Sequence, residues 1–210
     1  MVIMKDSKDK IKSIVLNSIK KEKDYHIYIL PDNLSKKLRA YASMRKDMEF
    51  CREALGELIK ILSNKENKRL STISLWVSII IIYCKCFTDA TTAKNPKLEK
   101  DKCFNEKSKH LEELHEQLIN LRHNFIAHRG DTDHEHLIAY MLVSKARDER
   151  GVFVKSLRAT STKPEKLKLY SELFLHIHNI IENKFNIEGG KLEEYLSKKS
   201  PEEIKQYLLV

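Results

Sequence analysis

Hydrophobic residues recur along this chain mainly at spacings of three and four, which is the period of an amphipathic helix. A first such segment, residues 6–22, carries Ile11, Ile14, Val15 and Ile19 on one side. A second follows Pro31-Asp32-Asn33, which can break the chain and cap a helix, and continues to about residue 63. The pattern therefore predicts two helices in the first third of the chain.

A third segment, about residues 68–87, is apolar nearly all round, which predicts a buried central helix. Its most hydrophobic run, Ile73–Cys84, is shorter than the ~20 residues that cross a bilayer. The N-terminal residues lack the apolar core and cleavage site of a secretory signal. We therefore expect a cytoplasmic protein that does not span a membrane.

A seam of apolar residues marks a fourth helix, about residues 108–129, that ends at Gly130. Its members follow one another at spacings of 3, 4, 3 and 4: Leu111, Leu114, Leu118, Leu121 and Phe125. The stretch before this helix, residues 88–107, is polar, rich in lysine and interrupted by Pro96. We expect that stretch to be a loop with a basic edge.

Two runs typical of β-strands follow, His136–Val143 and Val152–Leu157, and a polar turn ending in Gly151 makes them a predicted hairpin. Thr162-Lys163-Pro164-Glu165 has the signals of a helix start, so a fifth helix is predicted from there through Phe185. Gly189-Gly190 should end it. Ser200-Pro201-Glu202-Glu203 repeats the start signal for a short C-terminal helix.

Together these segments predict a mainly all-α fold, an antiparallel bundle of about five to six helices with one small β-hairpin after the fourth helix. The 5 glycines and 4 prolines are too few for a turn-rich all-β fold. A length of 210 residues suits one domain, residues 1–210, with no linker or repeat to divide it. Its core should span about residues 35–187, with residues 188–210 as a C-terminal helical extension.

The net charge of +9 is unevenly distributed. Residues 1–110 contain 24 Lys/Arg and 14 Asp/Glu, a balance of +10, whereas residues 111–210 contain 15 and 16, a balance of −1. Clustered cations favour a polyanionic partner, because they release counterions condensed on phosphates. Solvated lysine-rich helices explain the same composition without a partner, so charge alone leaves both interpretations open.

The seam of the fourth helix fixes where its polar residues lie. At ~100° per residue, Arg122 and His128 fall roughly 60° to either side of the seam, and His123 lies nearly opposite it. Arg122 and His128 are then ~120° and roughly 9 Å apart, too far to share one phosphate. Either the helix end at Ala127–Gly130 is distorted, or two copies of the segment converge in a dimer.

The segment Leu121-Arg-His-Asn-Phe-Ile-Ala-His-Arg-Gly-Asp131 resembles the HEPN superfamily, whose pattern is an Arg, a polar residue and a His four to six residues after the Arg, near the end of a bundle helix. It is most similar to HEPN-like proteins associated with phage abortive infection (the AbiU type), in which an Asn usually stands at the position of His123. The Trp76 to Cys84-Lys-Cys-Phe-Thr-Asp89 segment is similar more weakly. The resemblance covers about residues 35–187.

The resemblance implies a homodimeric bundle with metal-independent endoribonuclease activity and no cofactor, acting in phage defence or as a toxin, with an antitoxin or defence partner. Its catalytic residues would be Arg122, which binds the scissile phosphate, and His128, the general base or acid. His123, Asn124 and Arg129 would bind the RNA or nucleotide. The product would carry a 2′,3′-cyclic phosphate.

Many relatives have lost catalysis, so two other functions stay open. The chain is either a non-catalytic nucleotide- or RNA-binding module or a helical interaction protein in which the segment only packs a dimer. Arg122 would in that last case pair with Glu116, Glu113 or an acid of a neighbouring helix. His128 would be a helix C-cap that interacts with the helix dipole.

Six of the nine histidines lie within residues 110–136, close to Asp131 and Asp133: His110, His115, His123, His128, His134 and His136. Their spacing matches no metal signature, and His176 and His178 should lie on different faces of the fifth helix. The four cysteines, Cys51, Cys84, Cys86 and Cys103, lack the paired spacing of a zinc site. We therefore expect no metal centre and reduced thiols.

Overall fold

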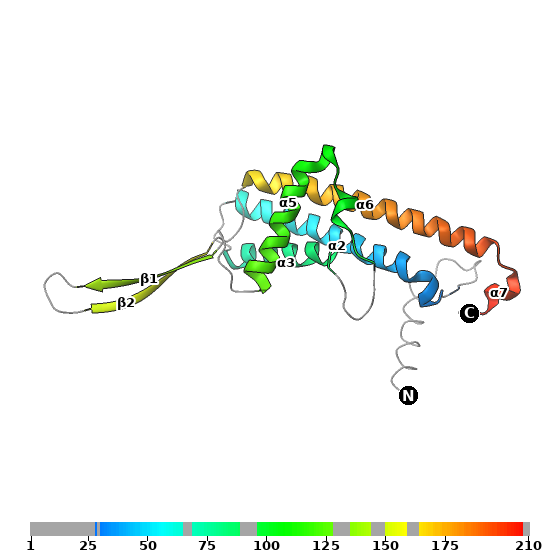
Figure 1. The fold of residues 1–210 in the computed structure, drawn as a ribbon, viewed down its shortest axis with the longest axis horizontal. Coiled ribbons are helices and arrows are strands. Elements are labelled where there is room, and N and C mark those ends of the chain that lie inside the picture. Colours follow the sequence, from blue (N-terminus) through cyan, green and yellow to red (C-terminus); the bar gives the residue numbers. More distant parts are fainter. Residues whose placement is uncertain are drawn as a thin grey trace, which may run out of the picture. The chain divides into compact units, whose positions relative to one another are not determined.

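The computed structural model describes residues 28, 30–64, 69–88, 96–127, 135–143, 150–158 and 164–207, and these are mainly helical with one β-hairpin (Figure 1). This confirms the predicted fold class. The chain divides into two compact units, Leu38–Asn186 and a second made of Met1–Lys37 with Ile187–Val210. The helix predicted over residues 6–22 lies outside the described residues. None of the described helices is long and apolar enough to cross a membrane.

Helix α2, Asp32–Ser63, begins where the sequence predicted. The Pro31 carbonyl accepts hydrogen bonds from the Leu34 and Ser35 amides at 3.1 and 3.0 Å, and the Ser35 hydroxyl also donates to it at 3.0 Å. Helix α3, Arg69–Lys85, is central, as predicted. It buries Thr72, Trp76, Ile79, Ile80, Tyr83 and Cys84.

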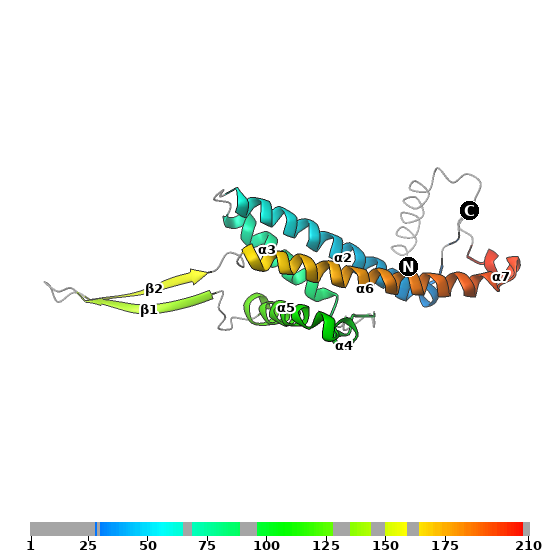
Figure 2. The same cartoon turned by 90° about the horizontal axis from the view of Figure 1, so that it is seen from above.

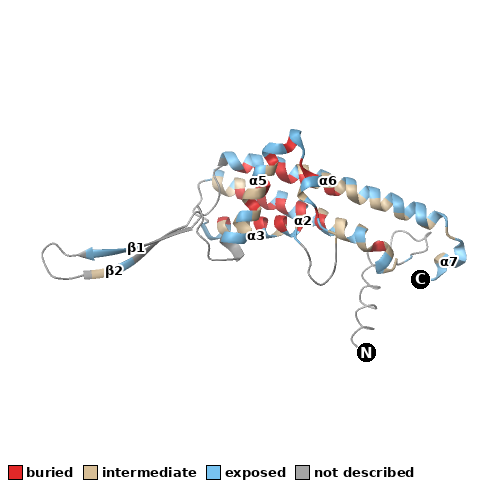
Figure 3. Cartoon of the chain, viewed as in Figure 1, coloured by how far each residue is buried: buried red, intermediate tan, exposed pale blue. Residues whose placement is uncertain are grey.

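Helix α6, Pro164–Ser197, lies beside α2 (Figure 2). Arg45 of α2 forms an ion pair with Glu182 of α6 at 3.5 Å, and the Trp76 and Tyr170 rings pack between α3 and α6 with centroids 5.3 Å apart. Buried residues concentrate where α2, α3, α5 and α6 meet (Figure 3). This core holds the helix that carries the candidate site.

The stretch over residues 88–107 differs from the predicted loop. Its described part contains α4, Lys100–Cys103, and a 3-10 turn, η1, Glu106–Ser108. Leu98, Cys103 and Phe104 are buried, and the Leu98 amide donates to the Cys86 carbonyl at 2.8 Å. The sequence did not predict these anchors because Leu98 and the pair Cys103-Phe104 lie among lysines and acids without a helical or strand period.

The prediction that Gly189-Gly190 ends the fifth helix is wrong, because α6 continues through both glycines to Ser197. Ion pairs at helical spacing flank the glycines, Lys191 with Glu188 at 2.8 Å and Lys198 with Glu194 at 2.6 Å. The next start signal is confirmed: α7, Pro201–Lys205, begins with a capping box in which Ser200 and Glu203 bond to each other's backbone amides.

The predicted hairpin is also confirmed, as strands β1, Glu135–Val143, and β2, Arg150–Arg158, paired antiparallel. Tyr140 stands opposite Phe153, and their rings stack with centroids 5.8 Å apart. Gly151 lies inside β2 rather than in the turn. Five apolar side chains of the hairpin are exposed: Tyr140, Met141, Leu142, Val152 and Phe153.

Candidate functional site

Helix α5, Lys109–Asn120, carries the predicted seam into the core. Leu111, Leu114 and Leu118 are buried, and Leu121 packs against them partly buried. The side chain of Phe125 lies outside the described residues. The seam therefore fixes the orientation of the helix that leads into the candidate segment, as the sequence predicted.

The candidate segment itself is not a regular α-helix. From Leu121 to Ala127 it is a π-helix, η2, which packs against α3. At the transition the Leu118 carbonyl accepts the Leu121 amide, and the Cys84 thiol donates to the same carbonyl at 3.5 Å. The helix predicted to about residue 129 is therefore α-helical only as far as Asn120, and angles calculated at ~100° per residue hold only to that point. Short π-helical segments occur frequently at functional sites.

Arg122 is half-buried near the start of η2. Burial raises the pKa of the Cys84 thiol to about 12, and the positive charge of Arg122 acts against that rise. No carboxylate among the described residues forms an ion pair with Arg122. Glu116, one of the predicted partners, instead binds Lys100 at 2.9 Å. The guanidinium is thus held next to the core with its charge uncompensated by any described acid.

His123 and Asn124 follow Arg122 and are both exposed. These three predicted site residues therefore follow one another in the first turn of the π-helix, one half-buried and two exposed. The other two, His128 and Arg129, lie outside the described residues, and so does the alternative role of His128 as a helix cap.

Below the segment, α5 carries a buried histidine whose role the sequence did not reveal. His115 is 3% exposed, and its Nδ1 is 2.9 Å from the hydroxyl of Tyr83 on α3. Burial lowers the pKa of His115 to about 4, so the ring is neutral at pH 7. Its neighbours are the rings of Phe87 and Phe104, with centroids 4.4 and 5.2 Å away. His115 is therefore a core residue rather than a metal ligand.

The signal that could have found His115 is its place on the seam: it directly follows Leu114 and precedes Leu118 by three residues. Considered only as one of six clustered histidines, His115 was not recognised as a residue of the buried face. His176 is also structural, since its Nε2 lies 2.8 Å from the Cys103 carbonyl oxygen and its ring stacks on Phe104. His178 points elsewhere, with a buried Nδ1 that has no described hydrogen-bond partner.

The four cysteines are free and buried. Burial raises the pKa of every one of them, to about 12 for Cys86 and about 11 for Cys103, so they remain thiols at neutral pH. Within the described part of the chain, no three His, Cys, Asp or Glu side chains come together to hold a metal. The described cysteines are therefore core residues without nucleophilic character.

Comparisons of the chain with models of protein families, with curated proteins and with solved structures found no match in any of the three. The functional interpretation therefore depends on the residues themselves.

Proposed function

We propose that this chain is a metal-independent endoribonuclease of the HEPN type, which acts as a dimer in phage defence or as a toxin. Its site would contain Arg122 and His128 as catalytic residues, with His123, Asn124 and Arg129 binding the RNA. The segment that carries them has the family's spacing and lies at the end of a bundle helix.

One observation supports this proposal above the others. Arg122 is half-buried on a π-helix, and no described carboxylate pairs with it. A structural arginine at such a place would normally be neutralised, because a partly buried charge without a partner is costly. A phosphate is the ligand that suits its planar fork of donors. The exposed His123 and Asn124 beside it can reach the same nucleotide.

The chemistry needs no metal. A base removes the proton of a ribose 2′-hydroxyl, whose oxygen attacks the adjacent phosphorus. The bond from phosphorus to the 5′-oxygen breaks, and an acid returns a proton to that oxygen. The products are a 2′,3′-cyclic phosphate and a 5′-hydroxyl. Arg122 would stabilise the negative charge that grows on the phosphate oxygens.

Two proton transfers favour two histidines, whereas one segment supplies a single catalytic candidate, His128. A two-fold dimer would supply two copies of His128 and of Arg122 to one cleft. The described surface of η2 presents His123 and Asn124, so they would line the approach to that cleft. The dimer is therefore part of the proposal.

The test is cleavage of single-stranded RNA in EDTA by the wild type and by Arg122→Gln and His128→Ala. We expect losses of about 10²- to 10³-fold for Arg122→Gln and ~10²- to 10⁴-fold for His128→Ala. Arg52→Gln is the matched control: it removes the same charge from an exposed site on α2 and should cleave like the wild type. Size-exclusion chromatography with light scattering checks that each variant is dimeric.

If both site variants cleave as fast as the wild type, the assignment is wrong. If the wild type binds RNA in a salt-sensitive way without cleaving it, the chain is the non-catalytic binding module instead. If Arg122→Gln dissociates the dimer and no RNA binds to any form, the segment serves only to pack two chains.

A further inference from the structure

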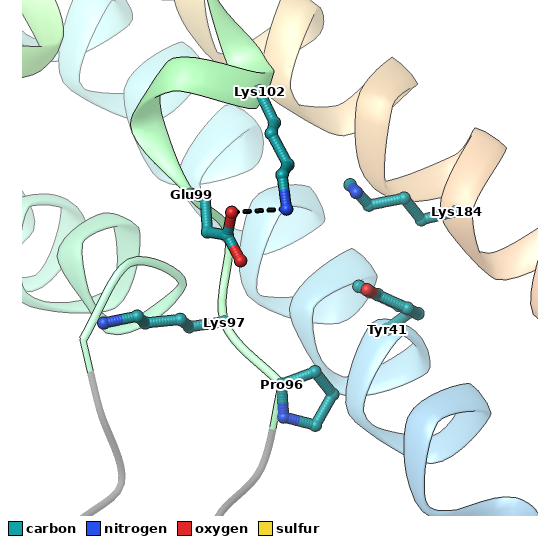
Figure 4. A pocket seen from close by; sticks show the side chains of 6 residues that line it. All are labelled: Tyr41, Pro96, Lys97, Glu99, Lys102 and Lys184. Carbon is teal, nitrogen blue, oxygen red and sulfur yellow. Dashed lines mark ion pairs between the residues drawn. The ribbon is translucent and has the colours of Figure 1, made fainter.

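A second basic site lies within Leu38–Asn186, at a pocket of about 310 Å³ (Figure 4). Its size falls at the lower end of the ~300–1,000 Å³ found for small-ligand sites. Three segments far apart in the sequence build it, namely α2, the residues around α4, and α6. They contribute Tyr41, then Pro96, Lys97, Glu99 and Lys102, and finally Lys184.

The pocket carries a surplus of positive charge, with three lysines against one carboxylate. Glu99 forms an ion pair with Lys102, and Lys97 extends away from the pocket (Figure 4), so Lys184 carries the positive surplus inside it. The bond to Lys102 lowers the pKa of the Glu99 carboxyl, and the charges of Lys184 and Lys97 lower it further. These lysines therefore stabilise negative charge at this end of the pocket. An anion bound beside Glu99 would meet the same lysine charges.

Lys184 is the cation best placed to meet that anion. Among the described residues no carboxylate forms an ion pair with it, and its Nζ lies 6.0 Å from the centroid of the Tyr41 ring. In Figure 4 the ammonium group of Lys102 meets the Glu99 carboxylate, the ammonium group of Lys184 and the hydroxyl of Tyr41 point towards the space beside that pair, and Lys97 extends away from it. Two cations and one hydroxyl therefore converge from α4, α6 and α2.

The types of side chain narrow the class of anion. Lysine ammonium groups bind phosphate as point charges, whereas planar carboxylates are recognised best by the arginine fork. Tyr41 adds a planar ring, which can stack on a nucleobase and donate a hydrogen bond from its hydroxyl. Pro96 adds a small apolar surface at the same rim. Phosphate and a planar ring together describe a nucleotide.

We propose that this pocket binds a nucleoside phosphate, with Lys102 and Lys184 on the phosphate and Tyr41 against the base. The ligand is a free mononucleotide or the terminal 5′-phosphate of an RNA, which share this chemistry.

The pocket is separate from the segment around Arg122. Tyr170 of α6 donates to Gln117 at 3.3 Å, which places that level of α6 beside the end of α5. Lys184 is 14 residues further along the same helix (184 minus 170), or roughly 21 Å at a rise of ~1.5 Å per residue. One nucleotide therefore does not reach both sites, and nucleotide binding does not depend on RNA cleavage.

The experiment is titration calorimetry of the full chain at low salt with AMP, with adenosine and with inorganic phosphate. We expect AMP to bind and adenosine, which lacks the phosphate, to bind much more weakly. Lys184→Gln should weaken AMP binding by roughly tenfold, the effect of losing one charged hydrogen bond. Lys168→Gln is the matched control, since it removes the same charge from an exposed position 16 residues earlier on α6 and should bind AMP like the wild type.

Tyr41→Leu separates the two parts of the ligand: it should weaken AMP binding and leave the affinity for inorganic phosphate unchanged. A short RNA with a 5′-phosphate, compared with its 5′-hydroxyl form, identifies the source. Binding of the phosphorylated RNA but not of AMP assigns the pocket to RNA ends, and binding of AMP assigns it to free nucleotides. The proposal is overturned if neither binds, or if Lys184→Gln and Lys168→Gln weaken binding equally.

Discussion

Arg122 and His115 lie seven positions apart on the same stretch of chain, yet they differ in burial and in charge. His115 is buried among aromatic rings and stays neutral, because burial disfavours its charged form. Arg122 keeps its charge at the boundary of the core without a described carboxylate partner. The first residue holds α5 against α3, and the second is the one we assign to phosphate.

The buried state of His115 predicts a dependence of stability on pH. An unfolded histidine titrates near pH 6.5, whereas folded His115 has a pKa of about 4. Between these values the unfolded chain binds more protons, so stability falls as pH falls from about 6.5 to about 4 and levels off below. The contribution lost is about 3 kcal/mol.

Urea unfolding of the wild type and of His115→Gln at pH 7 and pH 4.5 measures this effect. Gln does not titrate but can still bond the Tyr83 hydroxyl, so the variant should be the less stable protein at pH 7 and lose much less stability at pH 4.5. A difference between the two proteins that is the same at both pH values would contradict the assignment.

At the scale of elements, the helices marked by a pattern over several residues were predicted from the sequence, whereas those anchored by isolated apolar residues were not. The positions of α3, α5 and α7 were predicted because each has a signal that covers several residues. These signals are the apolar run of α3, the seam of α5 and the capping box of α7. Leu98 and the pair Cys103-Phe104 are anchors without a period, so α4 and η1 were missed. The π-helix over Leu121–Ala127 changes the backbone bonding without changing the residue pattern, so the sequence could not reveal it.

Two glycines inside helices lead to a second prediction, on the stability of their alanine variants. A Cβ added at Gly56 or Gly190 meets nothing within 4 Å, and both lie inside helices. Gly56→Ala and Gly190→Ala should each stabilise the protein by roughly 0.5–1 kcal/mol, because alanine loses less backbone entropy on folding.

Gly151→Ala in β2 is the contrasting variant, because the new Cβ would lie 2.7 Å from Cε2 of Phe153 and displace that ring from Tyr140. Thermal melts should therefore shift upwards for the two helical variants and not for Gly151→Ala. A lower melting temperature for Gly190→Ala would show that α6 does not continue through Gly189-Gly190.

At the scale of the whole molecule, the distribution of charge bears on the two proposed sites. The first 110 residues carry the entire positive surplus of the chain, and Lys97 and Lys102 of the nucleotide pocket come from them. The seven-residue segment Arg122–His128 begins twelve residues after the end of that half. The composition left an anionic partner as one of two interpretations, and only the fold shows that Lys184, from the balanced second half, joins the same pocket.

The central claim is that two chains share one RNA-cleaving site, and subunit mixing tests it most directly. Wild type and His128→Ala are mixed at a constant total concentration with a rising share of the variant. The mixtures are allowed to exchange subunits and are then assayed for RNA cleavage in EDTA. If both histidines of a dimer are needed, activity falls as the square of the wild-type fraction, so that about a quarter remains in an equal mixture. A linear fall, with about half remaining, or a wild type that does not cleave RNA, would contradict the account.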